Sequence, residues 1–96
     1  MTQIRRVVLD VLKPHDPTTV EFARGVAACE GVEGVNVSLI ETDQKVQNVK
    51  LTVEGSDVDY DAVLEAVESL SGSVHSVDQV ICGERLVEEQ ITPQDG

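Results

Sequence analysis

The chain has 96 residues, 41% of them hydrophobic, which suffices for one domain with a single core. Its net charge of −11, with 18 acidic residues against 7 basic ones, disfavours binding to nucleic acids and to anionic membranes. No apolar run is long enough to cross a membrane, and no secretory signal is recognisable, so we expect a cytoplasmic protein. We therefore predict one domain over residues 1–96, with its core at about 4–82 and a polar tail at 83–96.

The cysteines and lysines give information on the redox state and the salt concentration of the host cell. Cys29 and Cys82 are far apart and form no CxxC pair, which favours two reduced thiols in or near the core. A surface rich in acids and poor in lysine suits molar salt, where screening over about 3 Å removes self-repulsion. This pattern favours a halophilic host, and binding of cations is the alternative interpretation.

The first predicted element is a strand within residues 5–14, where aliphatic residues alternate with period two. Pro14 ends it, because proline has no N–H to donate to a sheet. A helix is then expected to begin at Asp16, which can cap it, and to run to Cys29 before Gly31 ends it.

Two strands with aliphatic residues at alternate positions follow at about 35–40 and 49–53. The polar turn between them is short, which predicts a hairpin. A second amphipathic helix is expected from Tyr60 to Leu70, and a fourth strand at 73–81.

The order strand, helix, strand, strand, helix, strand predicts an α+β, ferredoxin-like βαββαβ sandwich. It has a four-stranded antiparallel sheet with two helices on one face, and its first and third strands lie at the centre. The predicted core residues beneath the helices are Val7, Leu9, Val11, Val35, Val37, Leu39, Val49, Leu51 and Val53. On the opposite face Val8, Leu12 and Ile40 predict contact with another subunit.

Three phrases carry a family resemblance: LDVLKPHDP, GVEGVNVSLIETD and GSVHSVDQVICGERLVEEQITPQD. With them the chain resembles the archaeal Domain of Unknown Function 211 family over essentially its whole length. The resemblance implies a ferredoxin-like subunit, a cytoplasmic archaeal origin and homo-oligomers, in particular rings. It implies no established activity and no catalytic residues. The acid excess is typical of a haloarchaeal member.

Polar residues predict a site at one edge of the sheet. The end of the first strand, the starts of the second and fourth, and the loop entering the second helix are expected to bring together His15, Asp16, Asn36, Asp57 and His75, with Asp78 further along. Imidazole with carboxylate suits zinc or manganese, whereas oxygen ligands alone suit calcium or magnesium. No metal-binding motif is present, and the alternative is that Asp16 and Asp57 cap helices while the histidines are polar loop residues.

Asp10 is a carboxylate in the middle of the first strand. We interpret it as part of a cross-strand ion pair with Lys50 near Arg6, or as part of a subunit interface, rather than as a catalytic group.

The function that these features favour is a non-enzymatic homo-oligomeric module. It is expected to bind a small ligand or a divalent cation, calcium or magnesium, at the strand edge or between subunits. A purely structural homo-oligomer and a metal-dependent enzyme are the alternatives.

Overall fold

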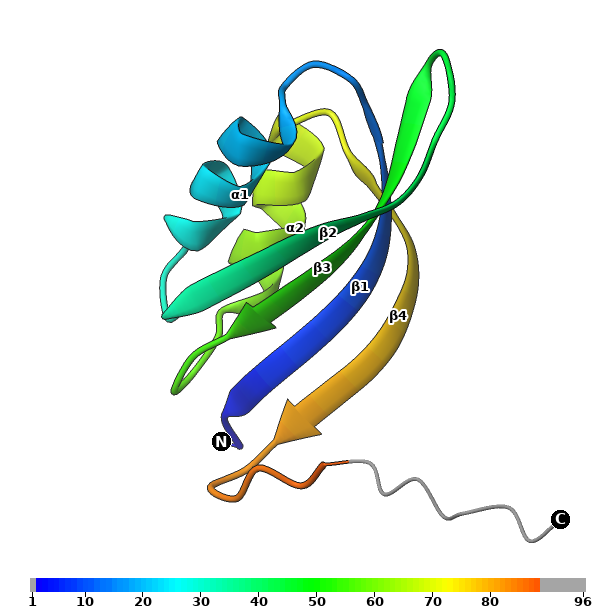
Figure 1. Cartoon of the computed structure of the whole chain (residues 1–96). Helices are drawn as coiled ribbons and strands as arrows, with labels where there is room; N and C mark the ends of the chain where they lie inside the picture. The colour runs from blue at the N-terminus through cyan, green and yellow to red at the C-terminus, as the bar shows by residue number, and fades with distance from the viewer. Residues whose placement is uncertain (1, 89–96) are drawn as a thin grey trace, which may run out of the picture.

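The computed structural model describes residues 2–88. In chain order its elements are β1 (Ile4–Pro14), α1 (Thr19–Ala27), β2 (Gly34–Thr42), β3 (Val46–Glu54), α2 (Tyr60–Ser69) and β4 (Ser73–Cys82). The strands form one sheet in the order β2-β3-β1-β4, and every neighbouring pair is antiparallel. Both helices lie on the same side of this twisted sheet (Figure 1). The predicted ferredoxin-like α+β sandwich is therefore confirmed.

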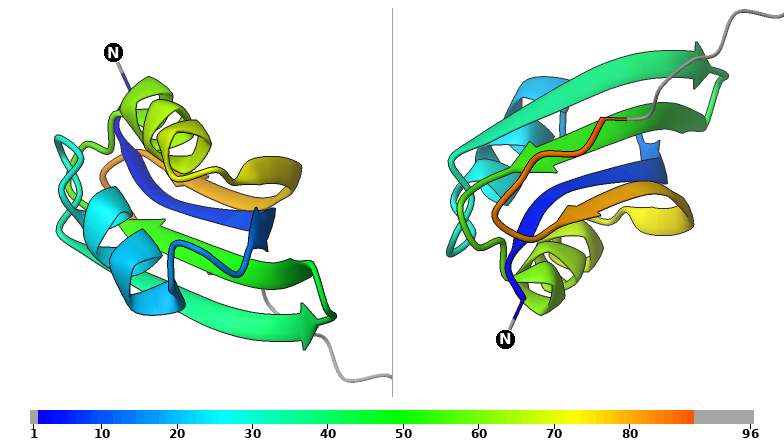
Figure 2. Two further views of the ribbon diagram at one scale, coloured as in Figure 1. Left: turned by 90° about the horizontal axis from the view of Figure 1, so that it is seen from above. Right: turned by 90° about the horizontal axis from the view of Figure 1, so that it is seen from below.

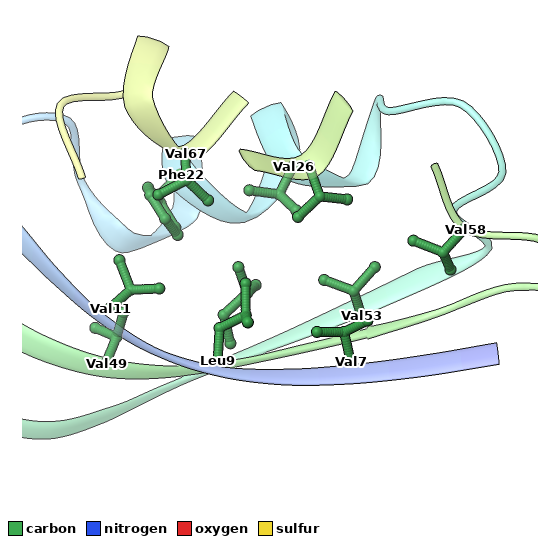
Figure 3. Packing of buried hydrophobic residues seen from close by; sticks show 11 residues of the cluster. Val7, Leu9, Val11, Phe22, Val26, Val49, Val53, Val58 and Val67 are labelled. Carbon is green, nitrogen blue, oxygen red and sulfur yellow. The ribbon is translucent and has the colours of Figure 1, made fainter. Parts of the chain in front are cut away.

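The core lies between the two central strands and the helices (Figure 3). Its fully buried members come from both layers: Val7, Leu9, Val11, Phe22, Val26, Val49, Leu51, Val53, Val63 and Val67. The prediction for β2 is only partly right, because Val35 and Val37 are half-buried and Leu39 is 50% exposed. β2 is an edge strand, and the helices cover the centre of the sheet more fully than its margins.

The first helix begins later than predicted, whereas the second begins at Tyr60 as predicted, and both have other caps than expected. Thr18, not Asp16, is the N-cap of α1, and its hydroxyl accepts a hydrogen bond from the Glu21 N–H at 3.2 Å. Threonine with glutamate three residues later is a capping box, a stronger start signal than an isolated aspartate. Asp59, not Asp57, caps α2 by accepting from the Ala62 N–H at 3.1 Å. Capping therefore does not explain Asp16 or Asp57.

Two loops pack tightly where β1 begins. A Cβ added at Gly55 would lie 1.9 Å from the Gly31 carbonyl oxygen, so only glycine fits there. Gly31 itself has φ of +82°, a left-handed conformation that follows the end of α1. The Gly55 and Val58 N–H groups donate to carbonyls of β1 at 3.1 and 2.9 Å. These bonds fasten the loop that enters α2 to the first strand.

After β4 the chain turns and crosses the face of the sheet opposite the helices, as the right-hand view of Figure 2 shows. We call residues 83–88 the strap and this surface the open face. The Gly83 N–H donates to the Gln3 carbonyl at 2.8 Å, and the Arg5 guanidinium donates to the Glu84 carbonyl at 2.9 Å. The strap is not part of a strand, and these bonds hold its beginning against the start of β1. Residues 89–96 of the predicted tail lie outside the described residues.

Candidate functional site

The predicted polar edge is divided between the two ends of the sheet. Gly34, at the start of β2, is opposite Glu54, which in turn is opposite Arg6 near the start of β1. Asn36 and Asp57 therefore lie towards the beginning of β1, whereas His15 and Asp16 follow its end. The prediction that all of these residues converge is wrong, because β2 runs in the same direction as β1.

His15, Asp16 and His75 do share one end of the sheet, since β4 begins opposite Leu12. All three are exposed, and His15 Nε2 lies 2.7 Å from the Asp43 carbonyl oxygen. Among residues 2–88 no three His, Cys, Asp or Glu side chains are grouped to hold one metal ion. A cation site at His15, Asp16 and His75 stays a prediction.

The β2–β3 turn is closed by Asp43. Its carboxylate accepts hydrogen bonds from the Val46 and Lys45 N–H groups, both at 2.8 Å. These donors, Val46 first, hold the pKa of Asp43 below its ordinary value, with a smaller contribution from His15. The Asp43 carboxylate is occupied by these backbone hydrogen bonds. His15 therefore contacts the Asp43 carbonyl oxygen and not its carboxylate.

The open face carries a depression of about 510 Å³. Basic, acidic and neutral polar groups line it: Arg6, Val8, Lys50, Thr52, Glu54, Asp78 and Gln79. Asp78 is thus part of this surface, and its carboxylate accepts from the Ser76 hydroxyl at 2.7 Å. We call this surface the open-face depression.

Of the two basic residues that line the depression, Arg6 makes ion pairs and Lys50 makes none among residues 2–88. The Nε of Arg6 lies 2.7 Å from Glu54 Oε2, and its Nη1 lies 2.7 Å from Glu88 Oε1 in the strap. Nη1 also contacts Gln79 Oε1 at 3.4 Å. The hydrogen bonds to Glu88 and then to Glu54 raise the pKa of Arg6, and the bond from Arg6 lowers the pKa of Glu88.

A family model of DUF211, described as "Uncharacterized ArCR", matches residues 5–96. This chain belongs to the DUF211 family. It is 44% identical over 95 residues to "Uncharacterized protein MJ0319" of the archaeon Methanocaldococcus jannaschii, an alignment covering 99% of this chain and 98% of that relative. The resemblance to an archaeal family is therefore confirmed, and neither description names an activity. Neither described helix of this DUF211 chain is long and apolar enough to span a membrane.

Asp10 has a different partner from the one predicted. It lies opposite Lys50 on β3, as expected, but its carboxylate accepts a hydrogen bond from the Asn48 side chain. Within residues 2–88 Lys50 makes no ion pair. The predicted Asp10–Lys50 bridge is therefore not formed, and Lys50 presents its ammonium group to the depression.

Val8 was expected to contact another subunit, yet it is only 7% exposed in this single DUF211 chain. Ile81, opposite Arg6 and hence also on the open face, is 4% exposed. The strap is the described segment that crosses this face (Figure 2), so the monomer itself shields part of it.

Lys13 is the functional candidate that the sequence interpretation missed. It is 1% exposed, and its ammonium donates to the Pro14 carbonyl at 2.8 Å and to Gln47 Oε1 at 2.9 Å. Burial lowers the pKa of Lys13, and Asp16 partly opposes that shift. The signal was present, because Lys13 continues the period-two series of Val7, Leu9 and Val11 that faces the helices. Both acceptors of the Lys13 ammonium are neutral groups, and they lie at the end of the core where β1 stops.

Proposed function

We propose that this DUF211 chain is a non-enzymatic assembly module whose copies associate through the edge strands β2 and β4. The observation that carries this proposal is the character of both edges. They are long, at nine and ten residues, and each has one side without a strand neighbour among the described residues. A long aliphatic edge presents unpaired backbone groups to another chain.

Exposed aliphatic side chains accompany both edges. Leu39 lies opposite Val49, and Val77 lies opposite Leu9, so all four point to the helix-bearing face. Leu39 is 50% and Val77 48% exposed, because the helices cover the margins of the sheet less fully than its centre. Val80 extends this aliphatic margin along β4.

Pairing β4 of one copy with β2 of the next would be antiparallel if both copies keep the same orientation, since β2 and β4 run in opposite directions. The Leu39 and Val77 margins would then meet on one face and bury each other. This contact is head-to-tail, so it generates a ring when the rotation closes. We therefore favour a ring over a two-fold dimer.

Native mass spectrometry of Leu39→Lys and Val77→Lys tests the edge contact. Each change places a charge on one margin, and we expect both variants to be monomeric where the wild type forms closed oligomers. Val20→Lys is the matched control, because Val20 is 61% exposed on α1 and belongs to neither edge strand. An unchanged oligomer in both edge variants, or a monomeric wild type in molar salt, would contradict the proposal.

The cellular setting is part of this proposal. We place the chain in the cytoplasm of a salt-rich archaeon: the archaeal relative supports the archaeal origin, and the charge of −11 supports high salt, in which screening lets acidic copies approach. A divalent cation, calcium or magnesium, bound by His15, Asp16 and His75 is the second candidate function. The observation that favours it is their common position at the end of the sheet where β1 stops.

A further inference from the structure

We infer that the open-face depression is a binding site for a small carboxylate ligand, and that Glu88 of the strap holds the ligand's place on Arg6. Ligand binding at the depression is independent of assembly through the edge strands. The strap has a regulatory role here, because Glu88 competes with the ligand for Arg6.

The first support is charge. The chain has only 7 basic residues against 18 acidic ones, yet two of the basic residues, Arg6 and Lys50, line this depression, together with Glu54 and Asp78. In the β1–β3 register Arg6 is opposite Glu54, four residues along β3 from Lys50, which separates Arg6 from Lys50 by about 13 Å along the strand direction. Both side chains are long enough to reach towards each other across the floor formed by Val8 and Thr52. A molecule with an acid group at one end and an acceptor at the other would span them.

The second support is the hydrogen-bond geometry of Arg6. Glu54 occupies Nε and so fixes the plane of the guanidinium, and the Arg6 side chain is only 18% exposed. Glu88 uses a single oxygen on Nη1, and within residues 2–88 Nη2 has no hydrogen-bond partner. A free carboxylate can instead bond Nη1 and Nη2 with both oxygens, the geometry that guanidinium groups favour. An external acid therefore gains a bond that Glu88 does not make.

The third support is the exposure of the competitor. The Glu88 side chain is 58% exposed, and ion pairs at such solvated positions are weak because water screens both charges. A ligand that binds weakly can therefore displace Glu88 from Arg6. The advantage of Glu88 is tethering, since a short flexible connection supplies an effective concentration of about 1 mM. Release of Glu88 raises the fraction of chains that are competent to bind, which tightens the apparent affinity.

The test is titration of the ¹⁵N-labelled full chain at pH 7 and constant ionic strength with glutarate, and with the neutral diamide glutaramide. We expect glutarate to shift the amide signals of Arg6, Lys50 and Thr52 to saturation, and glutaramide to leave them unchanged. Glu88→Gln should bind glutarate more tightly, by up to about fivefold, since a neutral amide competes poorly. Glu84→Gln removes the same charge from the strap outside the ion pairs described, and should bind as the wild type does.

Comparing Lys50→Gln with Lys45→Gln distinguishes binding at the depression from a general effect of the protein's net charge. Both residues are exposed lysines, but only Lys50 lines the depression. We expect weaker glutarate binding in Lys50→Gln alone. Three results would overturn the inference: no saturable shift with glutarate in either wild type or Glu88→Gln, equal shifts with glutaramide, or equal weakening in both lysine variants. Equal affinity in Glu88→Gln and wild type would overturn the role of the strap. A dispersed spectrum of each variant establishes that it is folded.

Discussion

Lys13 Nζ lies 5.9 Å from the centroid of the Phe22 ring, so the cation that β1 buries faces the aromatic ring that α1 buries. A cation over a ring face is attracted by the ring's quadrupole, which partly offsets the loss of water. The ammonium also keeps its two neutral acceptors, the Pro14 carbonyl and the Gln47 side chain. Substitutions of Lys13 can therefore separate the contribution of its charge to stability from the contribution of its packing.

Lys13→Met keeps most of the volume and removes the charge. We expect its free energy of unfolding at pH 7 to lie within about 1 kcal/mol of the wild type or above it, because buried charges are often replaced by apolar groups without loss. Lys13→Ala is the control for packing, and the cavity that it leaves should lower stability by about 2 kcal/mol or more. Urea unfolding measures both. A large loss in the Met variant would mean that the charge itself is required.

The difference in stability between the wild type and Lys13→Met should depend on pH in a direction that the pKa of Lys13 determines. The pKa of Lys13 is lowered by burial, so between its native value and the ordinary 10.5 the unfolded chain binds more protons than the folded one. Stability of the wild type relative to Lys13→Met should therefore rise with pH through that window. A difference that stays constant up to pH 10.5 would contradict the assigned cause.

Acid should release the strap. Arg6 holds the pKa of Glu88 below its ordinary 4.5, so the contact contributes fully above that value and is lost as pH falls through the native pKa. We expect the amide signals of Leu86 and Val87 to move with pH in that range in the wild type. Glu88→Gln should lack this transition, and an identical transition in the variant would assign it to another group.

The packed glycines where β1 begins should tolerate no side chain. Gly55→Ala would place a Cβ against the Gly31 carbonyl, and we expect a loss of more than about 2 kcal/mol on unfolding. Gly34→Ala is the matched control, because nothing lies within 4 Å of its added Cβ. Its stability should stay within about 0.5 kcal/mol of the wild type. Equal effects of the two changes in thermal unfolding would show that the loops can move apart.

Calorimetric titration with calcium, magnesium, manganese and zinc tests the cation site. If His15 and His75 are ligands, the double change His15→Ala with His75→Ala should abolish zinc or manganese binding and spare calcium or magnesium held by acids. Asp16→Asn should weaken every metal while the fold stays intact, since Thr18 rather than Asp16 caps α1. No heat from any of the four ions in the wild type would end this hypothesis.

Salt should stabilise the folded chain. With 18 acidic residues against 7 basic ones, repulsion falls as the screening length drops below about 3 Å in molar KCl. We expect the thermal midpoint to rise by several degrees between dilute buffer and about 2 M KCl. A midpoint that does not change over this range would remove the halophile interpretation.

Much of the fold could be predicted from local patterns. Period-two alternation at Val7, Leu9 and Val11, with a proline after them, defines a strand and its end without reference to any other segment. The order of elements and the handedness of crossovers then place β1 beside β3. These properties depend on neighbouring residues and on chain chirality, so one sequence suffices.

What only the tertiary structure decided depends on segments that are distant in the chain. Asn36 and Asp57 lie at the opposite end from His15 because the direction of β2 is set by its pairing with β3, not by its own residues. The strap could not be located either, since its anchors are the Gln3 and Arg5 groups some 80 residues earlier. The partners of Arg6 and the burial of Lys13 arise in the same way. Side-chain chemistry is written in the sequence, but which groups meet is determined by pairing across the sheet.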